Sequence, residues 1–241
     1  MRFGDLTYIE LRDVIAQDAI ALIPTGCTEQ QGPHLTVDFD TWLVTAICEA
    51  AAVRAEERHG VRVVVLPTVP FGPTPEHRSF GTGFVDLPQT THEAVIASVL
   101  ASVADQGFRR AVIWRGCGGH DLAGAVERFN ATQDRCRAVQ PDLPYRDIWL
   151  DKGDVRDEGG HADGFATSLA LHLRPESVRT DEIRDPDNRP VDWDDPNLDF
   201  GAYSSTGVLG RPTVASAELG ATLWEEIVSR TAEFIASHAR R

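Results

Sequence analysis

The chain has 241 residues, of which 42% are hydrophobic and 25% are charged. This balance is ordinary for a globular protein, and the length suits one large α/β domain. The formal net charge of −14 argues against a nucleic-acid-binding protein, because a phosphate backbone would be repelled over most of the surface. No run approaches the roughly 18 apolar residues of a membrane-spanning helix. The N-terminal segment carries several acidic residues and lacks the apolar core of a signal peptide. We therefore expect a cytoplasmic protein that binds neither membranes nor nucleic acid.

Four short apolar runs, rich in β-branched residues, predict strands buried on both faces of a parallel sheet. In chain order they are Ala19–Pro24, Val61–Leu66, Ala111–Trp114 and Tyr145–Leu150. Helical periodicity predicts helices over Asp40–Glu57, Thr91–Ala104, His120–Ala138, Gly164–Leu173 and Ala221–Ala236. The alternation of strands and helices predicts a three-layer α/β/α sandwich with a mostly parallel sheet and right-handed crossovers.

One long segment has no periodicity. The stretch Asp181–Tyr203 is rich in Pro, Asp and Asn, which predicts a loop that is either disordered or a lid over a functional site. The sequence shows no internal repeat and no second domain, so residues 1–241 are expected to form a single domain.

Polar side chains gather after the first predicted strand. The segment Thr25–Asp40 holds Glu29, His34, Asp38 and Asp40 within twelve residues. Ligands of open α/β sheets bind at the carboxyl ends of strands, and carboxylates beside an imidazole suit a divalent metal ion. The alternative is that Asp38 or Asp40 only caps the following helix.

A second polar segment follows the third predicted strand. It contains Cys117, Gly118, Gly119 and His120, and its glycines allow a ligand to approach the backbone closely. Cys27 also follows a strand, and it is either a buried small residue or a neighbour of Cys117 in a soft-metal site or redox pair. The four cysteines include no C-x-x-C pair, so they do not indicate a disulfide scaffold.

Four stretches together resemble one known family. The segment Pro24–Leu35 (PTGCTEQQGPHL), with Asp40 downstream, is similar to the creatininase signature P-x-G-S-x-E-Q-H-G-P-H-L-P-x-x-x-D. Glu76–Phe80, Arg115–His120 (RGCGGH, against N-G-H-G-G-N) and Gly207–Gly220 resemble further family blocks in the same order. The chain is therefore identified as a divergent member of the creatininase family. The resemblance implies an amidohydrolase with one or two divalent metals, acting on cyclic amides or formamides, and a homo-oligomer, commonly a hexamer.

The resemblance also assigns site residues one by one. Glu29 and Asp40 match metal ligands, with Asp40 at the position that bridges two metals, and His161 matches an acid–base histidine. Three positions depart from the family pattern: Gln31 and Cys117 each replace a histidine, and Ala166 replaces a glutamate. Because an amide is a poor metal ligand and a methyl group is none, a second metal is doubtful. The implied cofactor is one zinc or iron ion, with manganese as an alternative.

The leading hypothesis is a metal-dependent hydrolase acting on a C–N bond of a small polar metabolite. Its metal ligands would be Glu29, Asp40 and Cys117, with His120 beside them. His161 and His34 would handle protons, and the amides of Gly118 and Gly119 would steady an oxyanion. One alternative is a metal-free cyclase, isomerase or lyase of specialised metabolism with Cys117 as nucleophile. Another is a non-catalytic relative that binds a ligand.

Overall fold

The computed structural model describes residues 1–153, 159–187 and 189–239. Its centre is a parallel four-stranded sheet of order β2-β1-β3-β4. The strands are β1 (Ile20–Thr25), β2 (Val63–Val65), β3 (Arg110–Arg115) and β4 (Arg137–Val139). Leu22 of β1 stands opposite Val65 of β2 and Val112 of β3, which fixes the register at the centre of the sheet.

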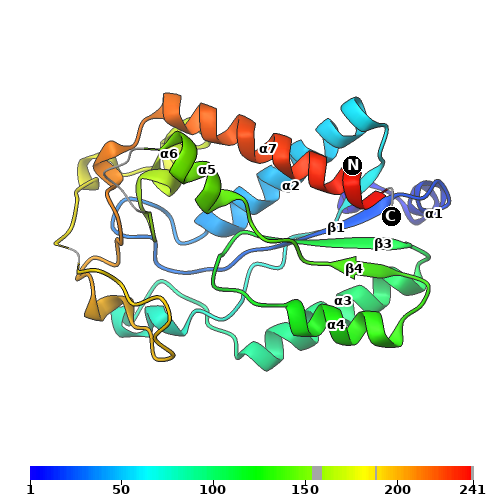
Figure 1. The fold of residues 1–241 in the computed structure, drawn as a ribbon, viewed down its shortest axis with the longest axis horizontal. Coiled ribbons are helices and arrows are strands. Elements are labelled where there is room, and N and C mark those ends of the chain that lie inside the picture. The colour runs from blue at the N-terminus through cyan, green and yellow to red at the C-terminus, as the bar shows by residue number, and fades with distance from the viewer. Residues whose placement is uncertain (154–158, 188, 240–241) are drawn as a thin grey trace.

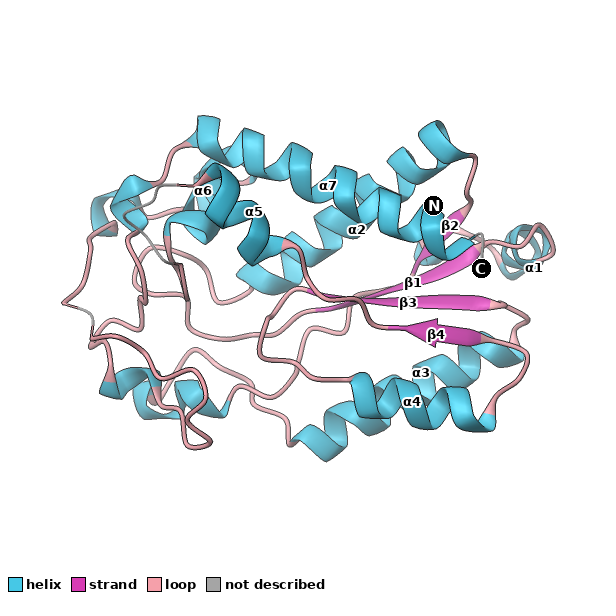
Figure 2. Ribbon diagram, in the orientation of Figure 1, coloured by secondary structure: helices cyan, strands magenta, loops and turns pink. Residues whose placement is uncertain are grey.

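Helices cover both faces of the sheet, as the alternation of elements predicted (Figures 1 and 2). One layer contains α2 (Phe39–His59), α5 (Tyr145–Lys152), α6 (Gly164–Leu173) and α7 (Ala217–Ala239). The opposite layer contains α3 (Gln89–Asp105) and α4 (Ala123–Thr132), and the short α1 (Tyr8–Ile15) lies at one end of the sheet. The three-layer α/β/α architecture is confirmed.

The two cores follow from the side-chain alternation of β1. Ile20 and Leu22 join the buried cluster that includes α2 and α7, whereas Ala21 and Ile23 join the cluster on the α3 side. Successive strand residues point to opposite faces, so a strand with every residue buried needs helices on both sides. This explains why β1 is a continuous apolar run and not an alternating pattern.

Local signals fix several helix ends. The Thr7 side chain accepts from the Glu10 backbone and the Glu10 side chain accepts from the Thr7 backbone, forming a capping box that starts α1, a helix the sequence reading missed. Gly60 ends α2 in a left-handed conformation. Asp163 starts α6 by accepting from the Ala166 backbone N–H, and α6 has the predicted bounds.

The predicted strand Tyr145–Leu150 is wrong, because this segment is the helix α5. Pro144 is its N-cap residue, and only Ile148 and Trp149 of α5 are buried, which gives the helix one apolar side. The fourth strand is β4, which overlaps the end of the range predicted as the helix His120–Ala138, and α4 ends before it. A three-residue edge strand is too short to show a periodicity of its own.

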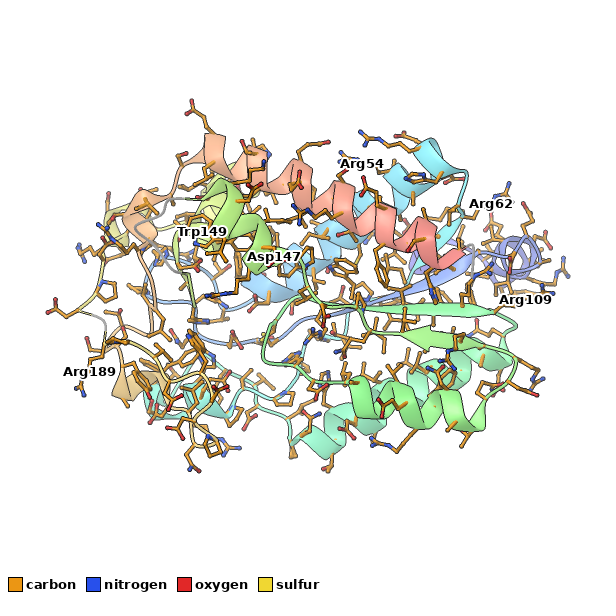
Figure 3. The ribbon with its side chains drawn as sticks, viewed as in Figure 1. Arg54, Arg62, Arg109, Asp147, Trp149 and Arg189 are labelled. Carbon is orange, nitrogen blue, oxygen red and sulfur yellow. The ribbon has the colours of Figure 1, made fainter. Side chains whose placement is uncertain are left out.

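The carboxyl ends of the strands all face the same side of the molecule. Arg62 and Arg109 come just before β2 and β3 and mark the amino ends, while Trp149 on α5 lies towards the opposite end (Figure 3). The described residues of the segment 181–203 lie at that opposite end too and include the short 3-10 helix Phe200–Ala202 (η5). Within the described ranges, no helix is both long and apolar enough to cross a membrane.

Two valines of α2 test this packing with the same chemical change. Val44 is fully buried and Val53 is 53% exposed. We expect Val44→Ala to lower the free energy of unfolding by about 2 kcal/mol, from the lost apolar burial and the cavity left behind. Val53→Ala should change it by less than about 0.5 kcal/mol. Urea unfolding of both variants measures the difference, and equal losses would contradict the assigned core.

Candidate metal centre

A cavity of about 690 Å³ opens at the carboxyl ends of β1 and β3. Its walls include Glu29, Asp40, Cys117 and His161, the four side chains that the sequence reading expected to converge, and also Gly118 and Gly119. The segment 181–203 contributes Trp193, Leu198 and Phe200 to the same cavity. The loops after two adjacent strands therefore meet at one site, as the strand-end rule predicts.

Two buried carboxylates form the floor of this cavity. Glu29 is 3% exposed and Asp40 is 8% exposed, and no Lys or Arg of the described residues lies within 4.0 Å of either. Burial raises the pKa of Glu29 well above its usual value and raises the pKa of Asp40 to about 6. Two buried acids without a Lys or Arg partner are costly unless protons or another cation neutralise them.

A thiol completes a potential set of metal ligands with these acids. Ligand atoms of Cys27, Glu29 and Asp40 all lie within 4.8 Å of one another, and the Cys27 thiol donates to Asp40 Oδ2 at 3.2 Å. Thiolate and carboxylate donors suit zinc or ferrous iron, so these residues fit a metal. The sequence predicts Cys117 as the thiol beside the carboxylates, whereas the structure places Cys27 there. Cys117 lies in a different group, with Cys27 and His120.

Gln31 occupies the space between the two acids. Its amide nitrogen donates to Asp40 Oδ2 at 2.7 Å and to Glu29 Oε1 at 3.2 Å. The amide therefore partly satisfies both carboxylates in the way that a cation would. Ala166 is buried and offers no ligand atom. The two positions that match second-metal ligands of the family therefore hold an amide and a methyl group.

Gln30 fixes the protonation of two histidines beside Glu29. Its Oε1 accepts from the Gly32 backbone, so its amide nitrogen must donate to His77 Nδ1, 3.1 Å away. His77 Nε2 then carries the proton and faces Glu29 Oε2 at 3.5 Å. His161 Nε2 donates to the Gln30 carbonyl at 2.7 Å, which leaves its Nδ1 facing Glu29 Oε1 at 3.6 Å. The sequence reading gave His77 no role in this group.

Two predicted site histidines lie outside the cavity wall. His34 Nε2 pairs with Thr167 Oγ1 of α6 at 2.8 Å, so the side chain ties the loop after β1 to α6. His120 is fully buried and packs against His92, with ring centroids 4.8 Å apart. Burial lowers the pKa of His34 to about 4 and that of His120 to about 3. Proton transfer by His34 therefore has no geometric support.

The backbone around the cavity offers further donors. In the part of the chain that is described, the N–H groups of Gly118 and Gly119 donate no hydrogen bond, and both residues lie in the cavity wall. The Arg115 guanidinium donates to the His120 carbonyl, and burial lowers the pKa of Arg115. Ala162, next to His161, has a φ of 49°, a left-handed conformation that is strained for alanine and typical of functional sites.

Comparisons with known proteins show similarity over most of the chain. The family model for creatininase, described as creatinine amidohydrolase, matches residues 4–235. The chain is 31% identical to a mycofactocin precursor peptide peptidase from Mycolicibacterium smegmatis, over 90% of this chain and 84% of the relative. It is 28% identical to a creatinine amidohydrolase from Pseudomonas putida, over 96% of this chain and 95% of the relative.

Solved structures show the same fold. A crystal structure of creatinine amidohydrolase has a TM-score of 0.82 and 25% identity, over 98% of this chain and 96% of that chain. A mutant creatininase of the Zn-Zn type has a TM-score of 0.82 and 25% identity, over 98% of this chain and 97% of that chain.

The role of Gln31 can be tested through stability. We expect Gln31→Leu to lower the unfolding free energy of the metal-free protein by about 1–3 kcal/mol, because two buried carboxylates lose a donor. Saturating zinc should reduce the difference in unfolding free energy between the wild type and Gln31→Leu, because the ion would neutralise the carboxylates in place of the amide. Thermal unfolding with and without zinc measures both values. The exposed Gln17→Leu is the control, and an equal loss with and without zinc would refute the assigned role.

The raised pKa of Asp40 predicts a pH-dependent stability difference. The folded protein holds this proton up to about pH 6, whereas the unfolded chain releases it near the usual value of 3.8. The stability contributed by protonated Asp40 is therefore complete below about pH 4 and is lost as pH rises through 6. Asn cannot lose a proton, so Asp40→Asn should stabilise the metal-free protein more at about pH 7.5 than at about pH 4.5. The gain is of order 3 kcal/mol at most.

Asp38→Asn is the matched control for this measurement. Although partial burial raises the pKa of Asp38, hydrogen bonds from Thr36 and Arg174 bring it below its usual value. Its stabilisation is therefore present above about pH 4 and lost on acidification, the opposite direction. Denaturant unfolding across this pH range gives both profiles. The same slope for the two variants would show that the burial of Asp40 does not control its titration.

Proposed function

Because this chain belongs to the creatininase family, we propose that it is a hydrolase that cleaves an amide C–N bond of a substrate held in the cavity. The observation that carries the proposal is the pair of buried acids Glu29 and Asp40 in the cavity wall, with the Cys27 thiol next to them. Relatives in the comparisons include an amidohydrolase and a peptide peptidase. Both names describe hydrolysis of a C–N bond, in a small molecule and in a peptide respectively.

Cys27, Glu29 and Asp40 would hold one divalent ion, for which zinc or iron suits the thiol and manganese suits the two carboxylates better. When bound, such an ion supplies Lewis-acid polarisation of the scissile carbonyl and activation of water. Gln31 has to withdraw its amide from the carboxylates for the ion to bind, because the amide nitrogen contacts both of them. Without the ion, the Gln31 amide keeps one oxygen of each acid hydrogen-bonded.

His161 would carry the proton from the attacking water to the leaving nitrogen. Its Nε2 is held by the Gln30 carbonyl, so its Nδ1 is the atom able to gain or lose a proton, and it faces Glu29. Rings of His77 and Phe200 pack against the imidazole and limit its rotation. A proton taken at Nδ1 can be delivered to the leaving nitrogen of an amide. The N–H groups of Gly118 and Gly119, which donate no hydrogen bond to any described residue, are suited to stabilise the developing oxyanion.

The cavity walls limit the class of substrate. Phe39, Tyr145, Trp149 and Phe165 supply aromatic surface, while Arg115 and Asp142 supply charge. The volume falls in the range of sites for drug-sized ligands, which accommodates a small polar metabolite or the end of a peptide. We propose an amide substrate of that size with both a polar and an apolar part.

Assays on purified protein test this function. Stripped protein would be reconstituted with zinc, iron or manganese and offered a formamide, a cyclic amide and short peptides. We expect amide hydrolysis that depends on the added metal. Asp40→Asn should lower kcat/KM by at least about 100-fold, because it removes a metal ligand. Asp38→Asn should have little effect, since Asp38 lies outside the cavity wall and forms an ion pair with Arg174. Equal activities of the two variants would refute the proposal.

A metal-free enzyme with Cys117 as nucleophile is the second candidate. Two observations favour it: Cys117 is a partly exposed thiol of the cavity wall, and the Gln31 amide already spans the two acids. Such an enzyme would keep its activity in a strong chelator and lose it on alkylation of Cys117. Cys48→Ser, at a buried position in α2, provides the control for loss of a thiol elsewhere.

A further inference from the structure

A second group of metal-binding side chains lies next to the carboxylates. Ligand atoms of Cys27, Cys117 and His120 all lie within 4.8 Å of one another. The sheet explains why the two thiols meet: Thr25 and Arg115 are partners in the parallel register of β1 and β3, and each cysteine stands two residues further along its chain. Adjacent parallel strands lie about 4.8 Å apart, so the side chains that follow them stay close.

The imidazole in this group is poorly satisfied. His120 is fully buried, and among the described residues neither ring nitrogen has a hydrogen-bond partner of normal geometry, although the Pro73 backbone carbonyl interacts with the ring. Its neighbour His92 is equally buried and also has no partner at either nitrogen. A buried polar atom left unsatisfied costs about 1–3 kcal/mol, and such atoms in native proteins often mark a bound water or ion. Two thiols beside His120 favour an ion.

The surrounding backbone holds the His120 ring in place. A Cβ atom on Gly72 would fall 2.2 Å from the His120 ring, so the backbone packs directly against it. His92 packs on it as well, with ring centroids 4.8 Å apart at an interplanar angle of 64°. A ring fixed in this way next to two thiols is preorganised for coordination, because little rotamer freedom remains to be lost.

We propose that Cys27, Cys117 and His120 form a second, thiolate-rich metal position that takes zinc or a similar thiophilic divalent ion. The Cys27 thiolate is shared with the carboxylate group Cys27–Glu29–Asp40. Binding converts the two thiols to thiolates and releases their two protons to solvent. Two cysteines and one histidine leave one coordination position open, and Cys117 lies in the cavity wall. This position differs from the one that Gln31 and Ala166 have lost, because neither of those residues belongs to it.

Cobalt titration tests the second position. Reduced, chelator-stripped protein would be titrated with Co²⁺, whose bonds to thiolate give a charge-transfer absorption. The wild type should bind two equivalents and form three cobalt–thiolate bonds. His120→Asn should weaken the second equivalent by at least about 100-fold. The charge-transfer intensity should then fall to roughly a third, since only the Cys27 bond in the carboxylate group remains. Cys117→Ser should also lose one equivalent, which guards against a folding defect of the buried His120 variant.

That Cys27 also belongs to the carboxylate group rests on the proposed function. The variant Asp40→Asn tests the carboxylate site separately from the thiolate-rich site. Asp40→Asn should lose the carboxylate-bound equivalent and keep the thiolate-rich one. If Asp40→Asn changes nothing while His120→Asn removes the absorption, the carboxylate site fails and the thiolate-rich site stands. If the wild type binds one equivalent that both variants weaken, a single ion uses all these residues and the second position is refuted. Unchanged titrations of His120→Asn and Cys117→Ser, matching Cys48→Ser and Cys136→Ser as controls, would also refute it.

Discussion

The burial of two carboxylates without a Lys or Arg partner is the constraint on which the rest of the site depends. Glu29 and Asp40 come from the loop after β1 and from the first turn of α2, and both are more than nine-tenths buried. In a medium of low polarity their mutual repulsion and desolvation favour protonation, and burial accordingly raises the pKa of both. The neighbouring groups can be understood by how they compensate the negative charge of the two acids.

Three neighbouring side chains direct a hydrogen atom towards one or both acids. Gln31 donates its amide to both acids, the Cys27 thiol donates to Asp40, and His77 turns its protonated Nε2 towards Glu29. The His77 orientation depends on Gln30, whose own orientation is set by the Gly32 backbone. In the metal-free site these donors reach Asp40 and Glu29 Oε1, whereas Glu29 Oε2 has no hydrogen-bond partner among the described residues. A cation would therefore compete with the Gln31 and Cys27 donors and could also contact the oxygen that they leave open. This competition distinguishes the chain from a family member with histidine at the Gln31 position.

The substitutions around the site change its chemistry in one direction. The positions held by Gln31 and Ala166 provide no hard second site, while Cys27 and Cys117 bring two thiols together at the ends of adjacent strands. Losing an imidazole at Gln31 and a carboxylate at Ala166, while gaining a thiol at Cys117, favours softer, thiophilic ions. The fold does not have to change for this, because β1 and β3 keep their register and the helices on both faces keep the strand ends fixed.

The sequence by itself determined the layered α/β fold, three of the four strands, the bounds of α6 and the cavity residues Glu29, Asp40, Cys117 and His161. These follow from continuous apolar runs, helical periodicity and the family-like motifs, which are all local patterns. It did not determine that Tyr145–Leu150 is helical or that β4 is a three-residue edge strand. Both depend on which surface each segment packs against, and short segments carry too few residues to show it.

The grouping of Cys27 with both metal positions, the burial of His120 and the tautomer of His77 were decided only by the tertiary structure. They depend on strand register and on hydrogen bonds between segments far apart in the chain, and no single stretch of sequence specifies these.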